Sequence, residues 1–350
     1  MLTKKQNKEI EEHLNKAQNP VFLYDNDADG LCSFVLLRRY IGRGKGVAIR
    51  SYPELDAGYA KRAQELGADY IFVLDKPVLS RAFFEEVDRI QVPLIWIDHH
   101  EASEQESAGE FENVHIYNPT LNKGKDKSSE PVTEMIYKIT KREEDIWIAV
   151  MGCIADHHMP EFAGEFAESY PDMWGNVKKP FDAYYGTEIG RIARSLNFGL
   201  KDSITRVVEL QNFLIKCKHP NEVLGEERGN ASFRETFRLL KDKYERILES
   251  AEKEKKGKMI FFSYGGETSM SADLANELSY RNPGKYVLMA FVKGPIANIS
   301  LRGNGVKEKL LNVLKEFPAG TGGGHTDAAG ARIKSDELER FRQLFEEKIE

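Results

Sequence analysis

The sequence contains few cysteines and no long hydrophobic run, and both absences limit what the chain can be. Its three cysteines, Cys32, Cys153 and Cys217, are too few and too scattered for a disulfide framework or a closed zinc site. We expect them to be small buried residues of a reduced protein. No run of about 18 apolar residues occurs, and the first 20 residues are polar, so we expect neither a membrane span nor a secretion signal. A cytoplasmic protein is therefore predicted.

A marked excess of positive charge is also absent. The 50 lysines and arginines are outnumbered by 56 aspartates and glutamates, which gives a formal net charge of -6. This total does not indicate a nucleic-acid-binding protein, although a local basic groove can occur on an acidic protein. What the chain does have is 350 residues, of which 41% are hydrophobic and 10% aromatic, enough for two domains with their own cores.

The order of apolar segments predicts an α/β fold. Short apolar runs at 20–24, 46–52, 69–75 and 92–100 alternate with helical patterns, which predicts crossover units and a parallel sheet. Residues 101–130 are polar and predict a long loop, interrupted by a short edge strand at 114–119.

The remaining residues predict a helical part followed by a mixed one. Residues 191–256 have a helical pattern with many charges, whereas strand and helix patterns alternate from 257 onward. We therefore expect a parallel-sheet domain at 1–190, a helical connector at 191–256 and a smaller mixed α/β domain at 257–350.

Acidic and imidazole side chains follow three strands of the first predicted sheet. They are Asp25, Asp27 and Asp29 after the first strand, Asp75 after the third, and Asp98, His99 and His100 after the fourth. The carboxyl ends of parallel strands meet at one edge of a sheet, so we expect these side chains to converge. The apolar helix at 144–158 can add Asp156 to the same cleft.

This convergence predicts a metal site. Four or more carboxylates in one cleft repel one another strongly unless a cation neutralises them. Carboxylates with one or two imidazoles and no thiolate suit manganese or magnesium, with cobalt, iron and zinc as alternatives. The number of acids indicates two ions, with Asp75 as the bridging ligand, and phosphoester hydrolysis as the chemistry.

Each of these residues also has a purely structural interpretation. A single aspartate at a strand end is usually a helix cap or a turn former, as Asp29 and Asp75 would be, and paired histidines are common at surfaces. Three strand ends that share one edge favour the metal site over these separate explanations. We interpret His157 and His158, which follow Asp156, as residues of the rim.

A glycine-rich segment in the second predicted domain is a candidate phosphate site. In "GTGGGHTDAAG", Gly322, Gly323 and Gly324 precede His325, and the run predicts either a flexible turn or a backbone nest for phosphate, followed by a helix or turn. The guanidinium of Arg302 can donate two hydrogen bonds to a phosphate, although an arginine at a strand end more often forms a surface ion pair.

Taken together, the motifs resemble the DHH phosphoesterase superfamily with its DHH-associated C-terminal domain. The segments "DNDADG", "VLD", "IDHH", "IADHH" and "GTGGGHTDAAG" occur in the order of that superfamily and span nearly the whole chain. The form "DNDADG" is similar to that of RecJ-like exonucleases, and we expect an archaeal member. The resemblance implies two Mn²⁺ ions, with Mg²⁺ or Co²⁺ as alternatives, and a second domain that closes over the cleft.

The resemblance also implies roles for individual residues. The first ion would be bound by Asp27 and Asp75, with Asp25 as an additional acid, and the second by Asp29, Asp75, His99 and Asp156. Asp98 would orient His99, and His100 would face the scissile phosphate. The substrate would be held by Arg302, Gly322, Gly323, Gly324 and His325, with Asn118 and Ser129 as weaker candidates.

The sequence departs from the superfamily in two respects, and the resemblance implies three alternative functions. Lys76 stands where many relatives have a small residue or histidine, a difference that bears on phosphate contacts near the metals. We expect no oligonucleotide-binding barrel after the C-terminal domain, and therefore do not expect processive action on long single strands. The leading function is a RecJ-like exonuclease on single-stranded DNA or RNA, in DNA repair. Alternatives are a phosphodiesterase of short oligonucleotides or cyclic-dinucleotide products, and a replisome scaffold. Replication or repair proteins are expected partners, and the oligomeric state is left open.

Overall fold

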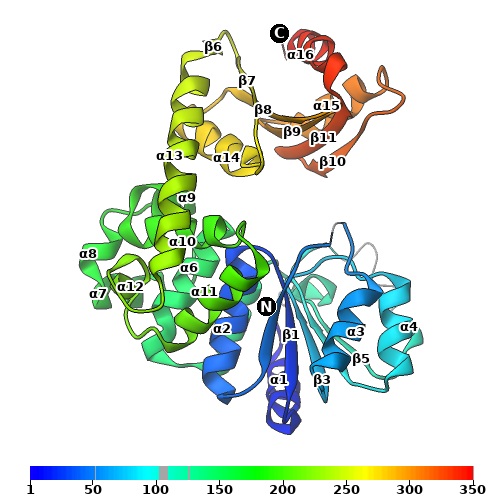
Figure 1. Ribbon diagram of the computed structural model, residues 1–350, viewed down its shortest axis with the longest axis vertical. Coiled ribbons are helices and arrows are strands. Elements are labelled where there is room, and N and C mark those ends of the chain that lie inside the picture. The colour runs from blue at the N-terminus through cyan, green and yellow to red at the C-terminus, as the bar shows by residue number, and fades with distance from the viewer. Residues whose placement is uncertain (52, 102–108, 125–126, 350) are drawn as a thin grey trace. The chain divides into compact units, whose positions relative to one another are not determined.

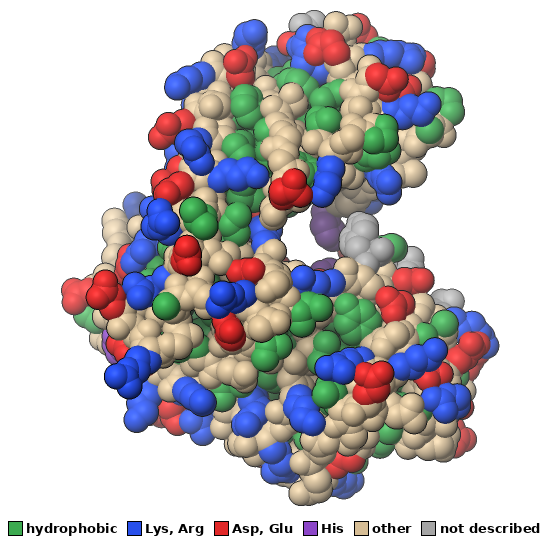
Figure 2. Space-filling model, in the orientation of Figure 1, with side chains coloured by type: hydrophobic (Ala, Val, Ile, Leu, Met, Phe, Trp, Pro, Cys, Tyr) green, Lys and Arg blue, Asp and Glu red, His purple; other side chains and the backbone are tan. Residues whose placement is uncertain are grey.

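The chain forms two compact units, residues 1–237 and 238–350, in a computed structural model that describes residues 1–51, 53–101, 109–124 and 127–349. Acidic and basic side chains are interspersed on the face shown in Figure 2, in keeping with the small net charge. No helix among the described residues is both long and apolar enough to pass through a membrane.

The first unit contains a five-stranded parallel sheet, as the sequence predicts (Figure 1). Its strand order is β2-β1-β3-β4-β5, and Leu23 of β1 lies opposite Val47 of β2 and Val73 of β3. The strands are β1 (Pro20–Asp25), β2 (Lys45–Ile49), β3 (Tyr70–Leu74), β4 (Leu94–Ile97) and β5 (Val114–Tyr117). The last strand lies in the predicted long loop, of which 102–108 and 125–126 are outside the described residues, as is the end of the predicted strand 46–52 at position 52.

Helices cover both faces of this sheet because side chains alternate along each strand. In β1, Phe22 and Tyr24 pack into the core beneath α2, α5 and α6, whereas Val21 and Leu23 pack into the core beneath α3 and α4. The helices of the first unit, with α13 crossing into the second, are α1 (Lys4–Lys16), α2 (Ala28–Ile41), α3 (Ala57–Glu65), α4 (Arg81–Arg89), α5 (Val132–Thr140), α6 (Ile146–Ala155), α7 (Ala163–Ser169), α8 (Pro171–Trp174), α9 (Pro180–Gly186), α10 (Glu188–Gly199), α11 (Ile204–Lys216), α12 (Pro220–Leu224) and α13 (Ala231–Lys253).

Polar caps set where the helices that follow the strands begin. Asp27 caps α2 by accepting from the Gly30 N–H, and Ser80 caps α4 by accepting from the Phe83 N–H. Gly42, at φ 71°, ends α2 in the left-handed conformation that glycine adopts most easily. The acidic turn after β1 therefore has a structural role in addition to any ligand role.

The second unit contains a mixed six-stranded sheet in the order β10-β11-β9-β8-β7-β6. Its strands are β6 (Lys255–Lys256), β7 (Met259–Gly265), β8 (Tyr286–Lys293), β9 (Ile296–Arg302), β10 (Thr321–His325) and β11 (Ala328–Lys334). The helices are α14 (Ser271–Arg281), α15 (Val306–Leu314) and α16 (Leu338–Glu347), and a separate apolar core lies between the sheet and α15 and α16.

The glycine-rich segment is a strand, so the predicted turn or nest is wrong. Gly322, Gly323 and Gly324 lie in β10 at the edge of the second sheet, and after a two-residue turn the segment "AAG" begins the antiparallel partner β11 instead of a helix or turn. A Cβ atom at Gly322 would lie 2.7 Å from the Gly330 carbonyl oxygen. The glycines thus let two strands approach closely, which is a backbone requirement that sequence propensity does not show.

Candidate metal centre

The strand ends that carry acids and imidazoles lie at one edge of the first sheet. Asp25 is the last residue of β1, Asp75 directly follows β3, and Asp98 directly follows β4. Since all strands are parallel, these three ends share an edge. Asp156 directly follows α6 as its C-cap.

Two sets of side chains at this edge could each hold a metal ion. Asp75, His99 and His100 offer ligand atoms within 4.8 Å of one another, and so do Asp29, His99 and Asp156. The His99 Nε2 atom lies 3.3 Å from Asp75 Oδ1 and 3.8 Å from Asp156 Oδ2. His99 thus belongs to both sets and connects them.

Asp75 combines backbone strain with nearly complete burial. Its φ of 60° is in the left-handed region, which is costly for a residue with a Cβ atom, and only 2% of the residue is exposed. Its buried Oδ1 atom accepts no hydrogen bond from any described residue. Burial, then the charges of Asp29 and Asp27, raise its pKa well above the usual value. A cation at Oδ1 would remove each of these electrostatic costs.

The same crowding affects the two acids at the mouth of the cleft. Desolvation, followed by repulsion from Asp25 and Asp29, raises the pKa of Asp27 to about 7. Desolvation, followed by repulsion from Asp29, raises the pKa of Asp156 to about 6. Asp27 is exposed and 41% of the Asp156 side chain is exposed, so water screens part of this repulsion.

Asp29 can serve both as a helix cap and as a metal ligand. Its two carboxylate oxygens accept the backbone N–H groups of Val132 and Thr133, at 3.0 and 2.8 Å. These are the first residues of α5, whose N-cap Pro131 provides no side-chain hydrogen bond. Asp29 therefore caps α5 from another element, and each oxygen keeps a second lone pair for a cation.

Lys76 gives Asp25 an internal counter-charge. The Lys76 Nζ atom lies 3.4 Å from Asp25 Oδ1 and donates to the Ser51 carbonyl oxygen at 3.2 Å, and only 3% of Lys76 is exposed. The sequence marks Lys76 as a departure from relatives but does not indicate its partner. This ammonium group would compete with a metal ion for Asp25.

Asp98 orients His100, so the predicted link from Asp98 to His99 is wrong. The buried Asp98 Oδ1 atom lies 2.9 Å from His100 Nδ1, and its Oδ2 accepts from the His100 N–H at 3.2 Å. The chain bends at His100 directly after β4 ends, and this brings the His100 ring and N–H onto the Asp98 carboxylate. Burial lowers the pKa of His100, but the hydrogen bond to Asp98 and its charge raise it overall.

The long loop supports this arrangement through buried and backbone groups. The Asn118 amide donates to the His100 carbonyl oxygen at 2.9 Å and to Asp98 Oδ2 at 3.3 Å, and only 1% of Asn118 is exposed. Asn118 is thus a positioning residue, not the substrate contact that we predicted. His99 Nδ1 lies 3.2 Å from the Ser129 carbonyl oxygen, whereas the substrate role of the Ser129 side chain stays a prediction.

A basic hollow adjoins the acidic cluster and was not predicted from the sequence. A cavity of about 370 Å³ extends from Asp25 and is lined by Arg50, Lys76 and Lys201. Arg50 and Lys201 lie in loops after β2 and α10, and no motif singles them out. The sequence also did not indicate that the buried Glu134 carboxylate lies 2.7 Å from His158 Nε2.

The remaining predicted residues lie in the second unit. Arg302 ends β9, and its guanidinium donates to Asn276 Oδ1 and to the Leu301 carbonyl oxygen. Gly322 and Gly324 are exposed on β10, and His325, which ends that strand, is exposed too.

The donor set as a whole fits a divalent cation. Carboxylate oxygens and imidazole nitrogens without a thiolate suit manganese or magnesium, and the buried Oδ1 of Asp75, which no described residue supplies with a hydrogen bond, provides an anchor.

Two family models match the chain. The DHH family, N-terminal domain, matches residues 21–159, and the DHHA1 domain matches residues 256–350. A search of curated protein sequences gave no match.

Several solved structures share the fold. RecJ from Thermus thermophilus in complex with Mn²⁺ is 15% identical, with a TM-score of 0.65 over 98% of this chain and 53% of that chain, so this chain spans about half of that RecJ. An exonuclease RecJ bound to manganese is 16% identical, with a TM-score of 0.66 over 99% of this chain and 94% of that chain. The DHH domain of a protein described as belonging to a family of ribosomal proteins is 15% identical, with a TM-score of 0.67 over 99% of this chain and 89% of that chain.

The two family matches lie in the two units of the structure and include every residue of the acidic cluster in the first. The chain therefore belongs to the DHH family of metal-dependent phosphoesterases, with a DHH domain followed by a DHHA1 domain.

Proposed function

We propose that this protein is a metal-dependent phosphodiesterase that removes terminal nucleotides from single-stranded DNA or RNA. The observation that carries this proposal is Asp75, whose buried Oδ1 atom accepts no hydrogen bond from the described residues and lies 3.3 Å from His99 Nε2 and 3.9 Å from His100 Nδ1. A strained residue that brings an unsatisfied charge to a cleft indicates a functional site.

The ions we propose are two Mn²⁺, with Mg²⁺ or Co²⁺ as alternatives. One would be held by Asp29, His99 and Asp156, the other by Asp27 with Asp25 as an additional acid, and Asp75 would contact both. When bound, such a pair activates water and stabilises both the attacking and the leaving oxygen of a phosphoester displacement.

His100 is the proposed catalytic group of the chain itself. Asp98 fixes its ring and raises its pKa, so the protonated form persists to a higher pH. A protonated imidazole can donate to a phosphoryl oxygen or to the leaving oxygen, and Asn118 keeps Asp98 in place for this purpose.

The substrate would be held by positive and backbone groups. Arg50, Lys76 and Lys201 line the hollow next to Asp25 and suit the phosphates of a nucleic-acid strand. In the second unit, we propose that Arg302, His325 and the glycines of β10 contact the strand. Residues 1–190 would thus be the catalytic domain, 191–256 the connector and 257–350 the substrate-binding domain.

An end-labelling assay tests this function. Single-stranded DNA and RNA, labelled at the 5′ or the 3′ end, are incubated with the protein and Mn²⁺, and a dinucleotide is added as a second substrate. We expect stepwise shortening from one end, lost in Asp75→Ala. Hydrolysis of the dinucleotide alone would favour the short-oligonucleotide enzyme instead. Intact strands in all reactions, with wild type and Asp75→Ala alike, would contradict the proposal.

A further inference from the structure

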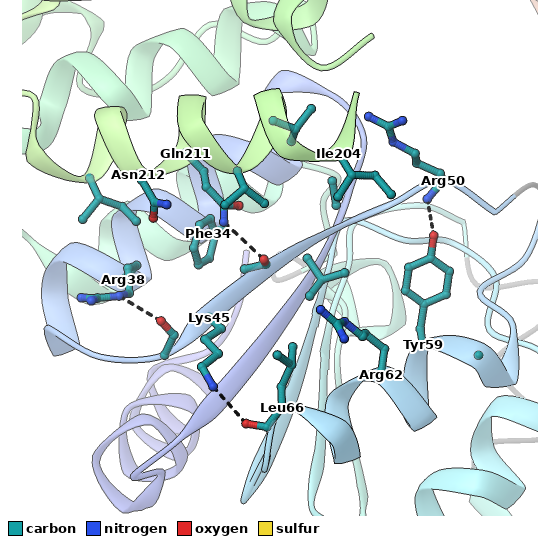
Figure 3. Close-up of a pocket in the computed structure, with 18 of the residues that line it drawn as sticks. Phe34, Arg38, Lys45, Arg50, Tyr59, Arg62, Leu66, Ile204, Gln211 and Asn212 are labelled. Atoms are coloured by element: carbon teal, nitrogen blue, oxygen red, sulfur yellow. Dashed lines mark hydrogen bonds between the residues drawn. The ribbon is translucent and has the colours of Figure 1, made fainter. Parts of the chain in front are cut away.

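A groove runs along the free edge of the first sheet and shares Arg50 with the hollow beside Asp25. It is a cavity of about 710 Å³ beside β2, which is the terminal strand of the sheet. Figure 3 shows β2 with α11 on one side and α3 on the other. Among the described residues, none of the acids and imidazoles of the metal centre lines this groove.

Every second residue along the outer edge of β2 directs its backbone N–H and C=O groups into this groove. The carbonyl oxygens of Gly44 and Gly46 accept from the side chains of Arg38 and Gln211, at 3.0 and 3.3 Å. The Arg50 N–H, four residues after Gly46, donates to the Tyr59 hydroxyl at 2.6 Å. Because the N–H and C=O of one strand residue point to the same side, even-numbered residues face outward.

Ala48 is the even-numbered residue between these capped positions. No hydrogen bond from outside the sheet reaches its N–H or C=O among the residues that the structure describes. Ala48 is half-buried, and its neighbour Gly46 has no side chain to cover the edge. A short stretch of free strand edge is therefore open to another extended chain.

Apolar side chains line the wall above this edge. Ile204 and Val208 of α11 are 69% and 39% exposed, although both are large and hydrophobic, and Val207 continues the same wall. Contiguous exposed apolar side chains beside an open strand edge are typical of binding surfaces.

The charges around the groove are mostly positive. Arg38, Lys45, Arg50 and Arg62 line it, against Asp56 as the single acid among the described lining residues. The Asp56 carboxylate already accepts from the Gly58 N–H at the start of α3. Arg62 is already paired with Glu65 at 2.9 Å, whereas Arg38, Lys45 and Arg50 form no ion pair with any described residue, so an occupant with acidic side chains is favoured by charge.

We propose that this groove binds an extended segment of a partner protein, with alternating apolar and acidic side chains, which adds as a strand to the outer edge of β2. Its backbone would pair with Ala48, its apolar side chains would contact Ile204 and Val208, and its acids would face the basic rim. This mode provides affinity through main-chain hydrogen bonds and specificity through alternate side chains. It does not depend on the chemistry at the metal centre.

The test starts from a displayed library of random short peptides that is selected on the full-length protein. The selected peptides are synthesised with a fluorescent label, and their Kd is measured by anisotropy. Ala48→Pro removes the outward N–H, and an edge strand tolerates proline at such a position. A second variant combines Ile204→Ser with Val208→Ser. The control is Leu239→Ser, a comparably exposed leucine outside the groove.

We expect selected peptides with alternating acidic and apolar residues, a Kd raised about tenfold in each groove variant, and no change in the control. Thermal unfolding checks that each variant is folded, and the double serine variant decides the test if Ala48→Pro is not. A library that yields no binding peptide, or peptides whose Kd is unchanged in the folded groove variants, would overturn the proposal. Binding that Arg62→Glu abolishes but the groove variants leave unchanged would also overturn the proposal, because it would indicate an anion site. A dimer of this protein that the groove variants dissociate would overturn it too.

Discussion

In the first sheet, the parallel strands β1, β3 and β4 end side by side, whereas in the second sheet the antiparallel strand β10 runs along an open edge. The first arrangement gathers Asp25, Asp75 and Asp98 at one place. The second exposes backbone along Gly322 and Gly324. Parallel direction thus concentrates charge at one edge of the first sheet, whereas the glycines of β10 leave main chain exposed in the second, and we propose that the first sheet carries the chemistry and the second binds substrate.

The largest expected effect is loss of activity when the bridging acid is removed. Asp75→Ala should lower kcat by about a thousandfold or more, because the charge stabilisation by bound metal contributes several kcal/mol. The measurement is Mn²⁺-dependent cleavage of a labelled strand. Asp172→Asn, a change of an exposed carboxylate outside the cleft, is the matched control and should leave kcat unchanged.

A smaller loss of activity is expected when Asp98, which orients the His100 ring, is replaced. Asp98→Asn should lower kcat about 10- to 100-fold, since partners that orient active-site histidines typically contribute this much. It should also lower the pKa of His100, so the loss of activity at high pH should begin at a lower pH. A pH–rate profile that keeps its position in Asp98→Asn would show that His100 does not act as the proton donor.

Substitutions in the second sheet should weaken substrate binding and leave the rate of the chemical step nearly unchanged. At Gly324, where φ is 136°, a Cβ atom would lie 2.5 Å from the Ala328 carbonyl oxygen, whereas at Gly323 it would meet nothing within 4 Å. Gly324→Ala should therefore cost about 1–3 kcal/mol of stability and raise KM with little change in kcat. Gly323→Ala is the matched control. A fall in kcat with KM unchanged would break the division between the two sheets.

The smallest expected effect concerns the metal-free protein. The pKa of Asp27 is about 7, above its ordinary value of 3.8, so its contribution to stability is full below pH 3.8 and is lost as the pH rises through about 7. With a chelator, Asp27→Asn should therefore raise the Tm at pH 8 by about 3 °C, the shift for about 1 kcal/mol after solvent screening. At pH 4 the variant should match the wild type. A Tm difference between the variant and the wild type that is the same at pH 4 and pH 8 would contradict the repulsion between Asp27 and its neighbouring acids.

Much of the first sheet could be predicted because its information is local. Each strand is a short apolar run, and each acid directly follows its strand, so the shared edge follows from parallel topology alone. The partners within that edge could not be predicted. Which imidazole Asp98 contacts depends on backbone direction after β4, and the pairing of Lys76 with Asp25 joins two different strands.

The second sheet was harder to predict because its edge strand lacks strand-forming side chains. Glycine has low β propensity, so β10 is held by pairing with β11 and not by its own composition. Asn118 shows a related limit. A polar residue in a predicted loop was expected to face substrate, but the loop folds it under His100, where only 1% of it is exposed.

The most direct test of the metal centre is anomalous diffraction at the manganese edge from crystals grown with Mn²⁺. We predict two peaks about 3.5 to 4 Å apart, with Asp75 in contact with both. A map with no peak at Asp75, or with a single peak that Asp75 does not contact, would contradict the two-metal site.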